Sequence, residues 1–327
     1  MFKLVLACLA SLIVTVVWGK FAIKLLVKLN FSQTILSYVG EHMQKNGTPT
    51  LGGIIFVFPS IILFLIFSSG SRLFSLFILA VFFAFFVVGF LDDFIKIKYR
   101  KNQGLTAGQK IVCQLVIAIL AAAFVCRMGI THQYIPFTKL FVDFEWWFLP
   151  IGIVVFLSCT NCVNLTDGLD GLAATTSCIY LFFSAVLIYI QMQAMPNYYQ
   201  TPQEYYNIIL LNGISAFSLI GYLGYNTNKA SVFMGDAGSL ALGGLCASTL
   251  MMSGNTFYIP ILGLVFVASG VSVIIQVAHY KRTKSRIFLM APLHHHFQHL
   301  GYSEAKIVYW YKLVCVIVGL ACLICYL

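Results

Sequence analysis

The stretch LFSLFILAVFFAFFVVGFLDDFIKIK, residues 73–98, is the most informative part of the sequence for the fold. Residues 73–91 carry no charged side chain, and a helix of about 20 apolar residues spans the hydrocarbon core of a bilayer. Asp92 and Asp93 follow at once, and Lys96 comes about one helical turn later. The stretch therefore predicts a membrane-spanning helix with charged side chains at the membrane boundary.

The composition of the whole chain agrees with a membrane protein. Of its 327 residues, 60% are hydrophobic and only 9% are charged, whereas a soluble protein carries about 25% charged residues. This excludes a cytosolic enzyme, a disordered chain and a small disulfide scaffold. We expect an all-α fold, a polytopic transmembrane helical bundle in which the helices satisfy their own backbone polar groups, with residues 1–327 forming one domain.

Ten apolar runs are expected to cross the membrane, and the fifth and eighth are short enough that nine or eleven spans remain alternatives. The first run lacks a small-residue cleavage site, so we expect a retained helix and no signal peptide. The runs are residues 4–29, 51–67, 73–91, 111–126, 147–161, 172–190, 208–225, 240–252, 257–278 and 309–327.

Positive charges indicate the orientation. Most of the 20 Lys and Arg residues fall in loops that follow odd-numbered runs, including residues 96–110 and 281–306. The positive-inside rule places these loops in the cytoplasm. The net charge of +10 is then explained by topology and by attraction to anionic head groups or substrates, so no nucleic-acid partner is expected.

The chain has only ten carboxylates, and five of them lie at or next to the ends of expected helices on the cytoplasmic side. Carboxylates at a membrane boundary are costly to desolvate and repel one another, so a group of them requires a compensating cation. Solvated acids at separate helix ends are the alternative. The five are Asp92, Asp93, Asp167, Asp170 and Asp236.

Four further stretches place polar side chains in the same loops: EHMQKNGTPTLGG (41–53), NCVNLTDGLDGLAA (161–174), YNTNKASVFMGDAGSLALGG (225–244) and RIFLMAPLHHHFQHLGYSE (286–304). Glycines beside Lys and Thr suit phosphate contact, and amides with carboxylates suit recognition of a sugar or base. Turn chemistry, an N-cap at Asp236 and metal transport through the histidines are the alternatives. The combination favours Mg²⁺-assisted chemistry on a phosphate ester at the membrane surface, with lysines neutralising developing charge.

The motifs GTPTLGG, GFLDDFIK, NLTDGLDGLA, VFMGDAGSLALGG and MAPLHHHFQ resemble those of the polyprenyl-phosphate N-acetylhexosamine-1-phosphate transferases. The resemblance extends from about residue 45 to residue 299, in the same order and with the same ten-span architecture. The MAPL segment before the three histidines resembles the muramoyl-pentapeptide branch of this family. Gln298 departs from the family pattern, which tends to show Glu at that place.

The resemblance implies transfer of phospho-MurNAc-pentapeptide from UDP-MurNAc-pentapeptide to undecaprenyl phosphate, giving lipid I and UMP, with Mg²⁺ as cofactor. It implies a bacterial plasma membrane location, membrane lipids as partners and a homodimer as one option. Asp92, Asp93, Asp236 and His294 are the implied catalytic residues, with Asp236 and Asp92 as metal ligands.

The resemblance also implies contacts to the donor, with Phe233 stacking on uracil, from Lys45, Asn164, Asp167, Gly168, Asp170, Asn226, Phe233, Gln276 and His295. From the residue types themselves we add Thr50, Lys96 and His296 as substrate contacts. The lipid phosphate is largely dianionic at neutral pH, because its second pKa is about 6. Direct displacement is therefore favoured over a covalent intermediate on an aspartate.

Two rival functions remain at this stage. A GlcNAc-1-phosphate transferase would use a different UDP-sugar in the same reaction. A proton or metal transporter would place its site near the bilayer midplane between related repeats. The ionisable residues here gather toward one membrane face, and we see no internal repeat in the sequence.

Overall fold

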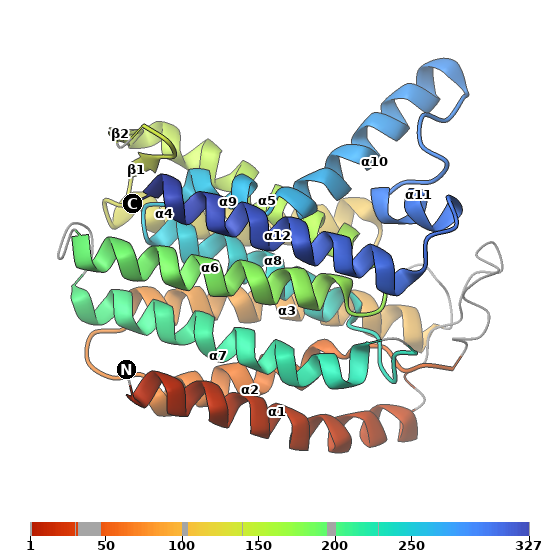
Figure 1. Ribbon diagram of the computed structural model, residues 1–327, viewed down its shortest axis with the longest axis horizontal. Helices are drawn as coiled ribbons and strands as arrows, with labels where there is room; N and C mark the ends of the chain where they lie inside the picture. Colours follow the sequence, from red (N-terminus) through yellow and green to blue (C-terminus); the bar gives the residue numbers. More distant parts are fainter. Residues whose placement is uncertain are drawn as a thin grey trace.

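A computed structural model describes residues 2–29, 31, 47–99, 104–138, 140–194, 201–227 and 229–326. As expected, the described chain is predominantly helical (Figure 1). The longer helices are α1 (Phe2–Lys28), α2 (Gly53–Phe67), α3 (Leu73–Lys98), α4 (Ala107–Arg127), α5 (Phe148–Thr166), α6 (Leu172–Ala194), α7 (Pro202–Asn226), α8 (Gly235–Met252), α10 (Leu264–Thr283) and α12 (Glu304–Tyr326).

The shorter elements are α9 (Ile259–Leu262), α11 (Leu293–His299) and the strands β1 (His132–Ile135) and β2 (Leu140–Asp143). The strands form an antiparallel pair, a small piece of sheet that the all-helical expectation did not include. It lies at the same end of the bundle as both chain termini (Figure 1). The termini share one end, as an even number of membrane crossings requires.

Eight helices of the described chain are long and apolar enough to span a membrane. This set includes neither α2, which has 15 residues, nor α8, which has 18. The structure therefore confirms a polytopic helical protein, while the count of ten spans stays a prediction.

Several predicted boundaries were wrong, among them the end of α3 and the starts of α7, α8 and α12. The eighth helix begins at Gly235, five residues before the expected start, so Asp236 lies inside its first turn. The run expected as one helix over residues 257–278 is broken at Gly263 into α9 and α10. Apolar periodicity does not reveal either feature, because glycine and small polar residues can continue a buried helix or end it.

Helix α8 runs through the middle of the bundle, and every residue from Ala237 to Met252 is buried. Small residues allow its neighbours to approach closely. A Cβ atom at Gly89 of α3 would collide with the carbonyl oxygen of Asp236, and one at Gly53 of α2 would meet the backbone of Gly238. Such glycine contacts bring helix backbones together in membrane bundles. They fix α2, α3 and α8 as one tight unit beneath the site.

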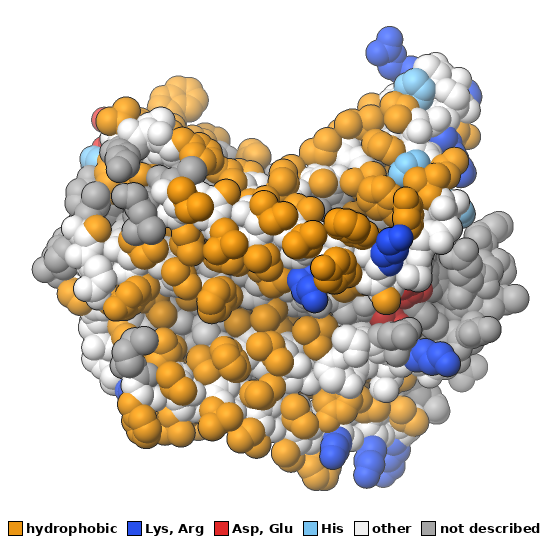
Figure 2. Space-filling view, in the orientation of Figure 1, with side chains coloured by type: hydrophobic (Ala, Val, Ile, Leu, Met, Phe, Trp, Pro, Cys, Tyr) orange, Lys and Arg blue, Asp and Glu red, His pale blue; other side chains and the backbone are white. Residues whose placement is uncertain are grey.

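Basic side chains gather at one end of the bundle, where α1, α3 and α10 finish (Figure 2). Helix α10 slopes away from the bundle toward this end, and α11 leads the chain back to α12 (Figure 1). The polar motifs of the sequence lie at the same end, as the assignment of odd-numbered loops to one side predicts.

Candidate active site

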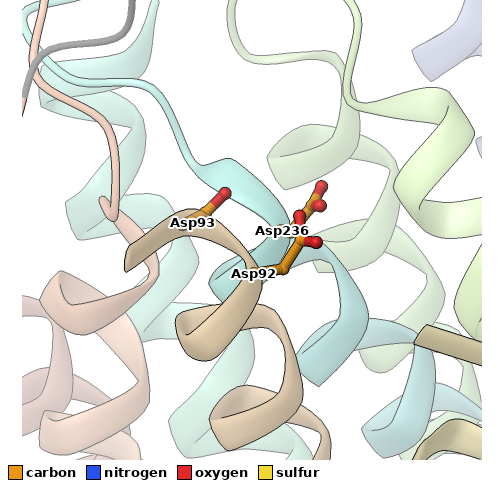
Figure 3. Close-up of side chains that lie close together, drawn as sticks. All are labelled: Asp92, Asp93 and Asp236. Carbon is orange, nitrogen blue, oxygen red and sulfur yellow. The ribbon is translucent and has the colours of Figure 1, made fainter. Parts of the chain in front are cut away.

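Three aspartates from two helices form the centre of the site. Asp92 and Asp93 belong to α3, Asp236 belongs to α8, and one carboxylate oxygen from each lies within 4.8 Å of the other two. The side chains of Asp92 and Asp236 lie close together, while the Asp93 side chain projects from the neighbouring position on α3 (Figure 3). We expected the two adjacent aspartates to end their helix. Instead α3 continues to Lys98, so both are buried within its last turns.

Asp93 joins α3 to the start of α8. Its Oδ2 atom accepts a hydrogen bond from the backbone N–H of Ala237 at 3.1 Å. Gly235 has a φ of +74°, and a Cβ atom there would collide with the Asp93 carboxylate, so glycine is required at this position. A carboxylate at a helix N-terminus also interacts favourably with the helix dipole. Asp93 Oδ1 is buried and accepts no hydrogen bond from the described residues.

Asp92 is held from two directions. Its Oδ1 atom accepts the backbone N–H of Leu105 at 2.8 Å, and its Oδ2 atom lies 2.6 Å from Lys96 Nζ. Leu105 comes just before α4, whose first turn is closed by a capping box between Thr106 and Gln109. The start of α4 therefore covers the Asp92 side of the cluster.

Two lysines neutralise the three acids in part. Lys96 Nζ lies 2.9 Å from Asp236 Oδ2 and 3.6 Å from Asp93 Oδ1, and Lys110 Nζ of α4 lies 2.8 Å from Asp236 Oδ2. The one-turn spacing allows Lys96 to face the aspartates if the helix continues, and α3 does continue to Lys98. Lys110 was not among the predicted site residues. Its only sequence signal was its place in a basic loop, because its contact with Asp236 is entirely tertiary.

Asn164 connects the end of α5 to this cluster. Its Nδ2 atom donates to Asp236 Oδ1 at 2.6 Å and to Ser239 Oγ at 2.8 Å. The second and third polar motifs of the sequence therefore meet at a single carboxylate, as the predicted shared pocket requires.

Asp167 follows α5 directly at its C-terminal end. Burial, and then the negative charges of Asp236, Asp93 and Asp170, raise the pKa of its carboxyl group to about 8. A carboxyl group that is neutral near pH 7 can donate a hydrogen bond as well as accept one. Asp167 therefore offers a donor to a ligand phosphate or base beside the acid cluster.

His294 reaches the site from α11. It is fully buried, and neither ring nitrogen has a hydrogen-bond partner among the described residues. A Cβ atom at Gly168 would collide with its Nε2 atom, so glycine makes the room for this imidazole next to Asp167. Burial, and then the neighbouring His295, lower the pKa of His294 to about 3. The ring is therefore neutral at physiological pH.

Asp170 and Asn226 hold the loops around the site together. Asp170 Oδ2 accepts the backbone N–H of Ala230 at 3.1 Å. Asn226 Oδ1 accepts that of Gly171 at 3.1 Å, and its Nδ2 atom donates to the carbonyl of Val232 at 2.9 Å. Both predicted substrate contacts thus tie the loop after α5 to the loop after α7.

Thr50 and Phe233 lie on the irregular segments before α2 and α8. Thr50 is buried near Gly235, and its Oγ1 atom has no hydrogen-bond partner within the described chain. The backbone N–H of Phe233 donates to Pro49 at 2.8 Å, and its carbonyl accepts from Gly52 at 2.8 Å. The Phe233 side chain is half-buried. Lys45, another predicted contact, lies outside the described residues.

Gln276, His295 and His296 form hydrogen bonds within α10, α11 and the connection between them. Gln276 Nε2 donates to the Phe288 carbonyl at 2.9 Å, and its Oε1 atom accepts two N–H groups from the same connection. His296 Nδ1 accepts the N–H of Leu289, and His295 Nδ1 lies 2.6 Å from Gln298 Oε1. Their assignment as substrate contacts stays a prediction.

The donor set suits a hard divalent cation. Magnesium binds carboxylate, phosphate and water oxygens, and it usually takes one or two protein carboxylates. Three carboxylates within 4.8 Å fit that preference. The oxygen that accepts no hydrogen bond from the described chain belongs to Asp93, whereas the oxygens of Asp92 and Asp236 also contact N–H or ammonium groups. The alternative use of the cluster is a purely internal ion-pair network with Lys96 and Lys110.

Comparison with known proteins identifies relatives along nearly the whole chain. The chain is 38% identical over 317 residues to the phospho-N-acetylmuramoyl-pentapeptide-transferase of Caldanaerobacter subterraneus subsp. tengcongensis, covering 96% of both chains. It is also 38% identical to proteins of the same name from Halalkalibacterium halodurans, over 93% of this chain and 92% of that one, and from Helicobacter pylori strain Shi470, over 90% and 85%.

The model of the glycosyl transferase family 4 matches residues 75–254. This range contains the three aspartates, both lysines and Asn164, and it ends before α10 and the histidines. The resemblance of the sequence motifs to the muramoyl-pentapeptide branch agrees with the names of the relatives. The chain belongs to the glycosyl transferase family 4.

Proposed function

We propose that the protein transfers phospho-MurNAc-pentapeptide from UDP-MurNAc-pentapeptide to undecaprenyl phosphate, forming lipid I and UMP. The observation that carries the proposal is the cluster of Asp92, Asp93 and Asp236 with Lys96 and Lys110 at one end of a membrane bundle. The similarity to named phospho-N-acetylmuramoyl-pentapeptide-transferases over nearly the full length supports this donor and acceptor.

In the proposed reaction, an oxygen of the lipid phosphate attacks the phosphorus that carries the sugar. The bond from that phosphorus to the bridging oxygen breaks, and UMP leaves with the bond's electron pair. The attacking phosphate needs no strong base, because it is largely dianionic at neutral pH. Lys96 and Lys110 are close enough to the acids to neutralise charge that develops on the phosphate oxygens.

We propose Asp236 and Asp92 as ligands of Mg²⁺, with Asp93 holding the start of α8 in place. When bound, the ion would neutralise the donor diphosphate and orient it for in-line displacement. Asn164 fixes the orientation of the Asp236 carboxylate through its hydrogen bond. His294 and Asp167, both neutral in this site, are proposed to hydrogen-bond the phosphates or the base of the donor.

The proposed location is the bacterial plasma membrane, with the site facing the cytoplasm. A cytoplasmic site is required if the donor is a water-soluble nucleotide made inside the cell. The basic side chains at the same end of the bundle support this orientation by the positive-inside rule (Figure 2). A homodimer is the proposed assembly, to be measured by light scattering of the protein in detergent.

The test is release of UMP by purified protein. Wild-type protein should release UMP only when UDP-MurNAc-pentapeptide, undecaprenyl phosphate and Mg²⁺ are all present, and EDTA should stop the reaction. UDP-GlcNAc offered to the same preparation should give no product. Stoichiometric UMP release without the lipid acceptor would instead indicate a covalent intermediate, and turnover of UDP-GlcNAc would indicate the other branch of the family.

A further inference from the structure

Residues 264–299, here called the arm, project from the bundle. They comprise α10, the connection after it and α11. The first part of α10 packs against α5, and its far end stands clear of the other helices (Figure 1). Apolar side chains on the projecting half are exposed, including Ile274 at 68% and Val277 at 46%. These exposed apolar side chains make this half of α10 suited to contact with lipid.

The far end of the arm is strongly basic. Lys281, Arg282, Lys284 and Arg286, here called the basic tip, are all exposed. Residues 264–303 contain no Asp or Glu, and none of the four cations pairs with a carboxylate among the described residues. The basic tip is therefore a group of uncompensated positive charges directly beyond an apolar helical surface (Figure 2).

Hydrogen bonds connect α10 to the segment that carries His294. Gln276 of α10 holds the backbone of Ile287 and Phe288, and Ser272 Oγ accepts the N–H of Leu293 at 3.0 Å. Leu293 begins α11, and the next residue is His294, which lies against Gly168. These hydrogen bonds link the far half of α10 to the start of the helix that carries His294.

We propose that the basic tip binds the phosphate head groups of anionic phospholipids in the leaflet on the side of the active site. The apolar half of α10 lies among acyl chains, so the four cations reach the level of the phosphates. Basic clusters next to a membrane helix attract anionic lipids in this way. The contact holds the arm at the angle that presents His294 to the site, and this second part rests on the proposed function.

The positive charge of the basic tip and the exposed apolar side chains of α10 together favour an anionic phospholipid as the partner. An acidic soluble protein would match the charge but would leave Ile274 and Val277 without a partner. A phospholipid matches both features, because its head group is anionic and its chains are apolar. None of the four residues of the basic tip is a catalytic or substrate-binding residue of the proposed site, so the tip can be altered without changing a catalytic side chain.

Binding is tested first, without substrate. Protein in detergent is titrated with dioleoylphosphatidylglycerol, with dioleoylphosphatidylcholine as the neutral reference, and bound lipid is counted by native mass spectrometry. We expect Lys281→Gln with Arg282→Gln to weaken phosphatidylglycerol binding about tenfold or more. The matched control, Lys24→Gln with Lys28→Gln at the same end of α1, should bind like wild type. Equal affinity of all three proteins, or equal affinity for both lipids, overturns the proposal.

Activity is tested second, in nanodiscs of the two lipids. Wild-type protein and the α1 control should release UMP several-fold faster in phosphatidylglycerol, and the tip variant should lose that gain while keeping the rate seen in phosphatidylcholine. A raised acceptor KM of the tip variant in phosphatidylcholine would show that the tip serves the lipid substrate, and would overturn the proposal. Because binding is measured without turnover, an inactive wild type would count against the proposed function alone.

Discussion

Lys110 Nζ lies 2.8 Å from Asp236 Oδ2, although 126 residues separate the two in sequence. The contact joins α4 to the first turn of α8, and Lys96 Nζ approaches the same oxygen at 2.9 Å. Two ammonium groups on one carboxylate oxygen indicate a site built to handle several negative charges, as a diphosphate substrate requires.

Lys110→Gln should lower the rate of UMP release about 10²-fold, because it removes a positive charge proposed to neutralise the reacting phosphates. The matched control is Lys98→Gln, an exposed lysine at the end of α3, which should keep most of the activity. Initial rates at saturating donor and acceptor measure both. Equal rates for the two variants would show that Lys110 acts only as a structural ion-pair partner.

Asp236→Asn should lower UMP release by about 10²–10³-fold or more, because it removes a charge proposed to bind Mg²⁺ and to pair with both lysines. The protein should still elute as a monodisperse peak in detergent. Raising Mg²⁺ to high concentration should restore little activity. A variant with wild-type turnover would remove Asp236 from the proposed metal site.

Phe233→Ala should raise the KM for the UDP donor and leave the KM for undecaprenyl phosphate unchanged. The ring is half-buried, and the backbone of Phe233 is held by Pro49 and Gly52, so the loop should keep its shape without the ring. Steady-state kinetics with each substrate varied in turn give the answer. An effect on the acceptor alone would contradict stacking on uracil.

Gly168→Ala should disturb the packing of α11, since the new Cβ atom would collide with His294 Nε2. We expect a loss of about 1–3 kcal/mol in the free energy of unfolding, together with reduced activity. Gly108→Ala in α4 is the control, because a Cβ atom there meets no other atom within 4 Å. Thermal unfolding in detergent compares the two variants with wild type.

The raised pKa of Asp167 predicts a dependence of stability on pH. The folded protein keeps this carboxyl group protonated up to about pH 8, whereas the unfolded chain releases the proton near pH 3.8. The unfolded state therefore binds fewer protons in this window, and the contribution to stability falls as the pH rises from about 4 to 8. The Asp167→Asn variant has no carboxyl group at this position, so its stability should not show this fall with rising pH.

The melting temperature of Asp167→Asn, relative to wild type, should therefore increase steadily over that pH range in EDTA and without substrate. A difference independent of pH would mean that Asp167 is ionised in the folded protein.

The sequence predicted much of the fold because membrane helices are marked by long apolar runs, and α3 is the best example. The one-turn spacing of Lys96 from the aspartates allowed their pairing, which forms because α3 continues past Asp93 and residues four apart then share a helix face. Lys110 and the early start of α8 were missed because they depend on contacts between distant segments. The local bonds of Gln276 were missed for the same reason, since only the folded arm brings Ile287 and Phe288 back to it.

The close glycine contacts among α2, α3 and α8 leave the three aspartates almost no freedom to move apart or together. The opposite wall of the site, made by α11 and the loops after α5 and α7, is held mainly by side-chain hydrogen bonds and by the contact of Gly168 with His294. Among related transferases that use different donors, the residues that differ should therefore lie mainly in that wall. The carboxylate spacing should be shared by enzymes that accept quite different sugars.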